Sequence, residues 1–283
     1  MTTVELSGSV LARELRAKLA ETAAALTTAG VPPRLAVVVA TEDESSAWYV
    51  RALAKAAAKT GIDCDVVDLG ATAEPAEIRT KLAALSADPA VHGIILQTPL
   101  PPDAKAEELA ASISPEKDVD GASPLSLGRI SAGLPAFAPA TAAAVLAVLD
   151  YYEVPLAGRH AVVVGRSTVV GKPAAQLLLA RNATVTVCHS RTRDLGEQTR
   201  TADVLVVAAG RSRMITGEHV RPGAVVVDVG TNPGEDGGLV GDVDAESVRG
   251  KASALTPVPG GVGPVTTALL LSHTVGSASR GAP

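Results

Sequence analysis

Two glycines and a serine follow the apolar run HAVVV, in the order Gly165, Ser167 and Gly171. Pro173 comes shortly after them and suits the first turn of a helix, where the N–H that proline lacks is not used. Small residues between a strand and a helix let the backbone approach a phosphate at the helix N-terminus. The spacing is one residue longer than GxGxxG, but its context favours a dinucleotide site. The alternative is a tight turn that binds nothing.

The second half's next apolar run, ATVTVCHS, ends at Ser190 and is followed by Arg191. A site for NAD usually carries Asp or Glu at this point, where the carboxylate binds the ribose hydroxyls. A hydroxyl and a guanidinium, together with Arg166 in the preceding loop, suit the 2′-phosphate of NADP instead. The sequence therefore predicts NADP rather than NAD. The alternative for Arg191 is an exposed, solvated side chain.

Two carboxylates stand before a glycine in the segment PEKDVDG, as Asp118 and Asp120. Their spacing alone is typical of exposed loop residues. The cysteines, Cys64 and Cys188, lie in separate strand-like runs without CxxC spacing or a neighbouring histidine partner. We therefore expect buried thiols and no metal site.

Short apolar runs alternate with longer helical segments, which is the pattern of parallel sheets flanked by helices. The predicted strands are residues 35–40, 64–69, 92–97, 160–165, 183–190, 203–210 and 223–230, and the predicted helices include 45–60, 75–86 and 141–152. Residues 98–139 are predicted to form a loop interrupted only by a short helix in AKAEELAASI.

The fold class is therefore α/β with two α/β domains, the second a Rossmann-like doubly wound parallel sheet. We expect residues 139–264 to form the NADP-binding domain, and residues 1–138 with 265–283 to form the other. The cleft between two such domains is the default place for a ligand.

The chain has 283 residues, of which 47% are hydrophobic and 19% charged, and its net charge is −5. These values are typical of a globular protein. Because no Lys/Arg run is present, neither nucleic acid nor a membrane surface is an expected partner. The first thirty residues carry charges throughout and lack the apolar core of a signal peptide. We therefore expect a cytoplasmic location.

Six segments together resemble the bifunctional methylenetetrahydrofolate dehydrogenase/methenyltetrahydrofolate cyclohydrolase family, and they follow one another in the family's order. They are VHGIILQTPLP, PEKDVDG, VVVGRSTVVGKP, ATVTVCHSRT, VVDVGTN and TPVPGGVGPVTTALL. The resemblance implies a homodimer of two-domain subunits, with the tetrahydrofolate substrate in the cleft and NADP on the second domain.

The resemblance also assigns site residues. It implies that Tyr49 packs against the aminobenzoate ring of folate, that Gln97 serves hydrolysis, and that Asp120 binds the folate. In the last segment, Pro259, Gly260 and Gly263 are expected near the folate, because its glycines permit close backbone approach; the alternative is a rigid interdomain link. Thr231 and Thr266 are expected to lie at the cofactor.

Among the positions that depart from the family pattern, one removes a charge. The family's Ser-x-x-Tyr-Val-x-x-Lys matches Ser46, Tyr49 and Val50, but Leu53 occupies the place of the lysine. Lys55 is two residues further on and therefore turned by about 200° around the helix from Leu53. It is expected to face solvent rather than replace the missing ammonium.

The missing lysine separates the two reactions that the family catalyses. Oxidation of methylenetetrahydrofolate transfers a hydride and needs no proton transfer, whereas hydrolysis of the methenyl product requires an activated water. We therefore expect an NADP-dependent dehydrogenase with weak or absent cyclohydrolase activity. Two alternatives remain: a non-catalytic folate- and NADP-binding paralogue with a regulatory role, and a one-carbon enzyme of a specialised pathway.

Overall fold

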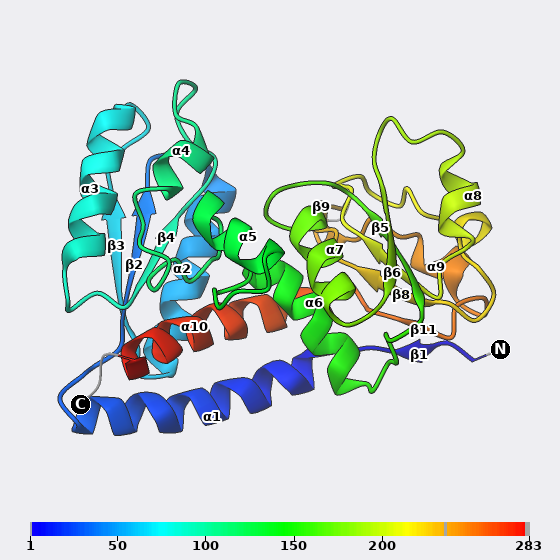
Figure 1. Cartoon of the computed structure of the whole chain (residues 1–283), viewed down its shortest axis with the longest axis horizontal. Helices are drawn as coiled ribbons and strands as arrows, with labels where there is room; N and C mark the ends of the chain where they lie inside the picture. Colours follow the sequence, from blue (N-terminus) through cyan, green and yellow to red (C-terminus); the bar gives the residue numbers. More distant parts are fainter. Residues whose placement is uncertain (1, 235–236, 281–283) are drawn as a thin grey trace. The chain divides into compact units, whose positions relative to one another are not determined.

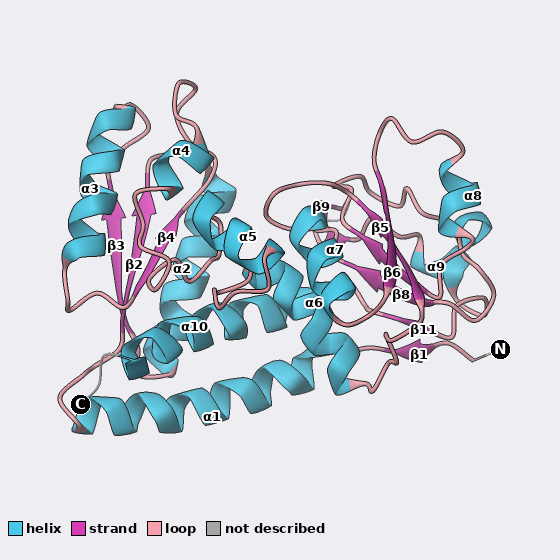
Figure 2. Ribbon diagram, viewed as in Figure 1, coloured by secondary structure: helices cyan, strands magenta, loops and turns pink. Residues whose placement is uncertain are grey.

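The computed structural model describes residues 2–234 and 237–280, which form two compact units. The three-stranded unit comprises residues 14–140 and 267–280, and the six-stranded unit comprises residues 2–13 and 141–266. Both units consist of a parallel sheet with helices around it (Figures 1 and 2).

The three-stranded unit has the strand order β3-β2-β4, all parallel. Its strands are β2 (Arg34–Val39), β3 (Asp63–Asp68) and β4 (Gly93–Leu96). Its helices are most of α1 (Gly8–Thr28), α2 (Glu44–Lys59), α3 (Pro75–Ala87), α4 (Ala106–Ala110), α5 (Pro124–Ser131) and most of α10 (Val262–Arg280).

Alternate residues of β2 face two different hydrophobic layers, as the two-residue period of a strand requires. Val37 and Val39 pack in one cluster with side chains of α1, α2 and α10. Ala36 and Val38 pack on the opposite face with side chains of α3 and α4. The sheet is therefore covered on both faces, and its ligand-accessible groups must lie at the strand ends.

The six-stranded unit has the strand order β1-β11-β8-β7-β5-β6, with every pairing parallel. Its strands are β1 (Val4–Glu5), β5 (His160–Val164), β6 (Thr184–Cys188), β7 (Val204–Val207), β8 (Val225–Asp228) and β11 (Ala254–Leu255), with a separate pair β9 (Asn232–Pro233) and β10 (Leu239–Val240). Its helical segments include α6 (Ala140–Tyr151), α7 (Gly171–Ala180), α8 (Leu195–Thr199), the 3₁₀ turn Gly217–His219 and α9 (Ala245–Val248).

The strand order reverses between β5 and β7. From β5 the chain goes first to β6 on one side and then to β7 on the other. In parallel α/β sheets, ligands bind outside the carboxyl ends of the strands at such a switch point. The same reversal occurs in the smaller sheet between β2 and β4.

The predicted α/β class, the parallel sheets and all seven predicted strands are confirmed, with boundaries that differ by a few residues. The prediction of a loop over 98–139 with one short helix is wrong, since α5 also forms there. Ser123 is the N-cap of α5: its side chain accepts a hydrogen bond from the Ser126 amide, and Pro124 occupies the first turn.

Residues 2–13 lie in the six-stranded unit, whereas the sequence analysis grouped them with the other domain. The physical reason is β1, which pairs in parallel with β11. Both strands have only two residues, too few to show a periodic pattern in the sequence.

Within residues 2–234 and 237–280, no helix is both long and apolar enough to cross a membrane. No group of three or more His, Cys, Asp or Glu side chains in the same ranges is placed to hold a metal ion.

Candidate functional site

Gln97 and Ser46 meet at the switch point of the three-stranded sheet. Gln97 directly follows β4, and its backbone amide donates to the carbonyl of Val38 near the end of β2. The Gln97 side-chain amide donates to the carbonyl of Thr98 at 2.7 Å and lies 3.5 Å from the hydroxyl oxygen of Ser46. Ser46 also donates to the same carbonyl at 3.0 Å. These bonds fix the first turn of α2 against the end of β4.

Tyr49 extends this site from the next position on α2. Its side chain is half-buried and packs against the cluster that contains Val37 and Leu53. Burial, and secondarily the negative charge of Asp120, raises the pKa of Tyr49 to about 12. The phenol is therefore neutral at physiological pH, and it presents an aromatic surface beside a carboxylate.

Asp120 carries an unusually basic carboxyl group. Burial, and secondarily the charge of Asp118, raises the pKa of Asp120 to about 7. Part of the Asp120 side chain nevertheless remains accessible to solvent. Within the described residues its carboxylate has no hydrogen bond or ion pair. A carboxylate without a protein partner, held beside a neutral phenol, is suited to bind a ligand.

Asp118 has a structural role instead. Its side chain is 1% exposed, so the sequence-based expectation of an exposed loop carboxylate is wrong for this residue. The carboxylate accepts from the amides of Ala122 and Ser123 at 3.1 and 2.9 Å, and from the hydroxyl of Ser126 at 2.6 Å. These bonds close the turn that follows Asp120.

Leu53 lies one turn beyond Tyr49 on α2 and belongs to the hydrophobic core, with 1% of its surface exposed. Lys55 is exposed, as expected. Among the described residues, no lysine or arginine contributes to the pKa shift of Tyr49 or of Asp120. Tyr49, Gln97 and Asp120 therefore supply an aromatic ring, an amide and a carboxyl group, and no cation of the described residues shifts the pKa of the phenol or of the carboxyl.

In the six-stranded unit, Gly165 directly follows β5 at the switch point. Its φ of 134° is one that side chains rarely adopt, and a Cβ there would overlap the carbonyl oxygen of Ala208, beyond the end of β7. A Cβ on Gly171 would overlap the carbonyl of Gly165 itself. Both glycines are therefore required for the close approach of the loop to the start of α7.

Ser167 stabilises this loop from inside. Its hydroxyl oxygen accepts from the amides of Val170 and Gly171 at 3.2 and 3.3 Å, and its carbonyl accepts from the Lys172 amide at 3.0 Å. The amides of residues 166–169 have no hydrogen-bond partner within the described part of the chain. Free amides beside a helix N-terminus are donors for phosphate oxygens.

Ser190 and Arg191 reach the same edge of the sheet as the glycine loop. The strands β5 and β6 pair from His160 to Val164, and the Gly165 amide donates to the carbonyl of Cys188 at 2.8 Å. Ser190, Arg191 and Arg166 are exposed, and their side chains make no hydrogen bond or ion pair among residues 2–234 and 237–280. Ser190 and Arg191, after β6, and the loop after β5 thus lie at one edge of the sheet.

Two buried carboxylates that were not among the predicted site residues hold the neighbouring loops. Asp242 accepts from the amides of residues 209–211 at 2.6–2.8 Å, after β7. Asp228 accepts from the amides of Gly230, Asp242 and Val243 at 2.9–3.0 Å, and burial raises the pKa of Asp228 to about 6. Thr231, exposed after β8, is therefore on a loop with a fixed backbone.

The segment from Pro259 into the first turns of α10 also belongs to the six-stranded unit. Pro259 and Gly263 are exposed. Gly260 has a φ of 107°, and its carbonyl accepts from the Gly8 amide at 2.9 Å. The Thr266 hydroxyl donates within its own helix, to the carbonyl of Val262 at 3.2 Å. The segment is thus anchored on its own unit and exposes several of its residues.

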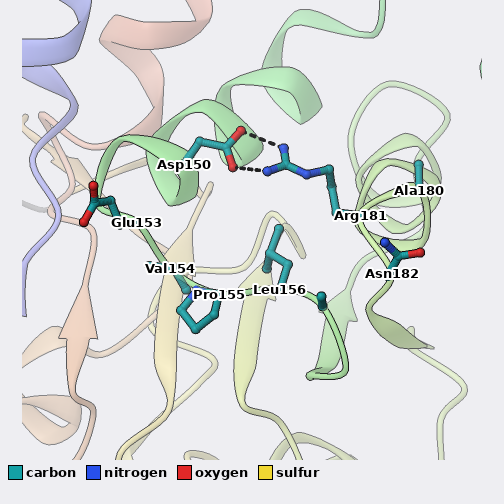
Figure 3. A pocket seen from close by; sticks show the side chains of 9 residues that line it. Asp150, Glu153, Val154, Pro155, Leu156, Ala180, Arg181 and Asn182 are labelled. Atoms are coloured by element: carbon teal, nitrogen blue, oxygen red, sulfur yellow. Dashed lines mark hydrogen bonds and ion pairs between the residues drawn. The ribbon is translucent and has the colours of Figure 1, made fainter.

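A cavity of about 490 Å³ lies elsewhere on this unit (Figure 3). Its lining includes Asp150 and Arg181, joined by two hydrogen bonds of 2.6 and 2.7 Å, and the segments that lead into β5 and β6. It therefore lies at the amino ends of these strands, at the edge opposite Gly165. Ligands of parallel α/β sheets bind at the carboxyl ends, so this cavity is not the candidate site.

Comparison with known proteins agrees with this geometry. Residues 6–120 match the family model described as tetrahydrofolate dehydrogenase/cyclohydrolase, catalytic domain, and residues 139–282 match the NAD(P)-binding domain of the same family. The bifunctional protein FolD 1 of Saccharopolyspora erythraea is 70% identical over 281 residues, which cover 99% of this chain and 96% of that protein.

Solved structures of enzymes from this family are also similar to the chain. The bifunctional enzyme FolD of Campylobacter jejuni is 41% identical, with a TM-score of 0.96 over 98% of this chain and 99% of that one. The FolD of Trypanosoma brucei, solved with NADP cofactor and inhibitor, is 36% identical, with a TM-score of 0.93 over 99% and 98% of the two chains. The chain is thus an enzyme that belongs to the tetrahydrofolate dehydrogenase/cyclohydrolase family.

Proposed function

We propose that this enzyme oxidises 5,10-methylenetetrahydrofolate to 5,10-methenyltetrahydrofolate with NADP, and that it hydrolyses the methenyl product slowly or not at all. The observation that carries the second part is the burial of Leu53 in the core, one turn from Tyr49. The family of the chain supports the first part.

The residues around Gly165 fit a dinucleotide. The overlap that a Cβ would make at Gly165 and Gly171 supports a close backbone approach, and the free amides of residues 166–169 provide donors for the pyrophosphate. Ser190 and Arg191, with Arg166, offer a hydroxyl and two cations for a 2′-phosphate. When bound, NADP supplies the acceptor for the hydride.

For the oxidation, the protein needs to hold folate in line with the cofactor and to favour the growing positive charge on the folate. Tyr49 offers an aromatic surface for the aminobenzoate ring. Asp120, once ionised, places a negative charge at the same site, and no other group of the described chain neutralises it. Neither role requires a proton transfer, so the loss of a lysine leaves this reaction intact.

Hydrolysis of the methenyl group makes a different demand. A water must be activated, and a titratable group that can accept or donate a proton must be close to it. Gln97 remains, but an amide does not titrate, and its NH₂ is already engaged with the Thr98 carbonyl. Leu53 has no polar atom. The site therefore lacks a proton-transfer partner for Gln97.

We further propose that Pro259, Gly260 and Gly263 contact the folate, and that Thr231 and Thr266 lie at the cofactor. The family resemblance also leads us to propose a homodimer. Light scattering of the purified protein tests that assembly, and a monomer at micromolar concentration would contradict it.

The function itself is tested by two rates measured side by side. NADPH formation from methylenetetrahydrofolate should be fast, and the decay of supplied methenyltetrahydrofolate should exceed the uncatalysed rate little or not at all. No NADPH formation would contradict the dehydrogenase and favour a non-catalytic binding protein. Equally fast rates would contradict the role assigned to Leu53.

A further inference from the structure

A hydrogen bond joins the C-terminal helix to the residue before Asp120. The Nδ1 atom of His273 lies 2.8 Å from the carbonyl oxygen of Val119, 154 residues earlier in the chain. A carbonyl can only accept, so the imidazole must carry its proton on Nδ1. Burial lowers the pKa of His273, which favours this neutral form. Val119 is fully buried, and its carbonyl belongs to the peptide unit that leads directly into Asp120.

The same helix makes a second bond to this loop. Ser277 lies one turn after His273, and its hydroxyl donates to the carbonyl of Glu116 at 2.7 Å. The Asp118 carboxylate closes the other side of the loop through its three bonds. The backbone on both sides of Asp120 is therefore fixed, whereas the Asp120 carboxylate has no partner in the described part of the chain.

The orientation of the imidazole is itself fixed by Phe137. The two rings stack with centroids 4.8 Å apart and an interplanar angle of 26°, and the guanidinium carbon of Arg280 lies 4.9 Å from the centre of the Phe137 ring. Phe137 also packs against the loop, because a Cβ on Gly121 would overlap its carbonyl oxygen. Phe137 therefore contacts both His273 and the loop that carries Asp120.

We propose that His273 is a positioning residue for folate: through the Val119 carbonyl it sets the place and direction of the Asp120 carboxylate. It acts through the backbone and does not contact the substrate. The inference rests on the proposed function in one respect, namely that Asp120 binds the folate. It adds that the C-terminal helix determines how well that carboxylate is placed.

Three substitutions separate the hydrogen bond from the ring stack. His273→Asn places an amide nitrogen where Nδ1 is and keeps a donor for Val119, but it removes the ring. His273→Phe keeps a ring against Phe137 and removes the donor. His273→Ala removes both. The quantities to measure are KM for methylenetetrahydrofolate, KM for NADP, kcat and the melting temperature.

We expect the Phe and Ala variants to raise KM for the folate by about tenfold, which corresponds to about 1.4 kcal/mol, with KM for NADP unchanged. The Asn variant should stay within about threefold of the wild type. Ser277→Ala, which leaves the imidazole in place, should raise the same KM by a smaller factor. It provides the test if the Phe variant does not fold.

Two results would overturn the inference: a Phe variant with the wild-type KM for folate, or an Asn variant as impaired as the Ala variant. Equal rises of both KM values in all three variants would also overturn it, because they indicate a general structural defect. Asp120→Asn is measured in parallel. If that variant keeps the wild-type KM for folate, the proposed role of Asp120 fails; if it is impaired while the Phe variant is normal, only the role of His273 fails.

Discussion

Tyr49 and Leu53 occupy successive turns on one face of α2, and they differ in what they present to the site. Tyr49 is half-buried beside Asp120, whereas Leu53 is 1% exposed within the core. The resemblance to the family implies a lysine at the second position. The face of α2 that would carry the ammonium group is therefore hydrophobic, while the aromatic surface next to it is kept.

Cofactor preference is expected to depend on the two residues after β6. Replacing Ser190 and Arg191 by alanine should lower the preference for NADP over NAD by about 10- to 100-fold, or about 1–3 kcal/mol, because charge-assisted bonds to the 2′-phosphate would be lost. The ratio of kcat/KM for the two cofactors measures this. An unchanged ratio would leave Arg166 as the residue that reads the phosphate.

The glycine loop provides a second test of the nucleotide site. Gly171→Ala should raise KM for NADP by at least about tenfold, because the new methyl group would overlap the Gly165 carbonyl and push the loop away from α7. Gly128→Ala is a matched control: it lies within α5, and its Cβ would meet no atom within 4 Å. A Gly171 variant with normal cofactor binding would argue against the phosphate loop.

The rate of oxidation should respond to the ionisation of Asp120. Because burial raises the pKa of Asp120 to about 7, the carboxyl is protonated below that pH and charged above it. We expect kcat/KM for methylenetetrahydrofolate to rise with pH through about 7 and then level off. Asp120→Asn should lower kcat/KM and remove this rise. A profile that keeps the rise in the variant would assign the titration to another group.

The ionisation of Asp120 should also lower the folding stability as the pH rises, whereas it raises kcat/KM. A carboxyl whose pKa is higher in the folded than in the unfolded state binds more protons when folded, so stability falls as pH rises from about 4 through about 7. The Asn side chain of Asp120→Asn cannot ionise. We therefore expect the free energy of unfolding of this variant to exceed that of the wild type by about 1–2 kcal/mol at pH 8, and to equal it at pH 4. Asp228, with a pKa of about 6, would retain part of the slope in the variant. Denaturant unfolding at both pH values measures the difference, and equal differences would contradict the environment described for Asp120.

The features that the sequence predicted correctly have local sequence patterns. Seven strands showed as short apolar runs, and the phosphate loop showed as small residues between one such run and a helix. The start of α5 also has a local signal, because Ser123 and Pro124 are residues typical of a helix N-cap and first turn. These features depend on neighbours within a few residues, so one sequence is enough to reveal them.

Contacts between distant parts of the chain could not be predicted in this way. The pairing of β1 with β11 joins residues about 250 positions apart through two-residue strands. The bond from His273 to Val119 and the burial of Asp118 likewise depend on where the finished fold places each segment. The spacing in PEKDVDG therefore could not separate a structural Asp118 from the unpartnered Asp120.

The central claim is that Leu53 separates the two reactions, and Leu53→Lys tests it most directly. The ratio of methenyltetrahydrofolate hydrolysis to methylenetetrahydrofolate oxidation is measured in the wild type, in Leu53→Lys and in Leu53→Met, whose side chain has a similar length but no charge. We predict that lysine raises the ratio by on the order of tenfold or more, despite a stability cost of about 1–3 kcal/mol, and that methionine leaves it unchanged. A ratio that is the same in all three proteins would contradict the account.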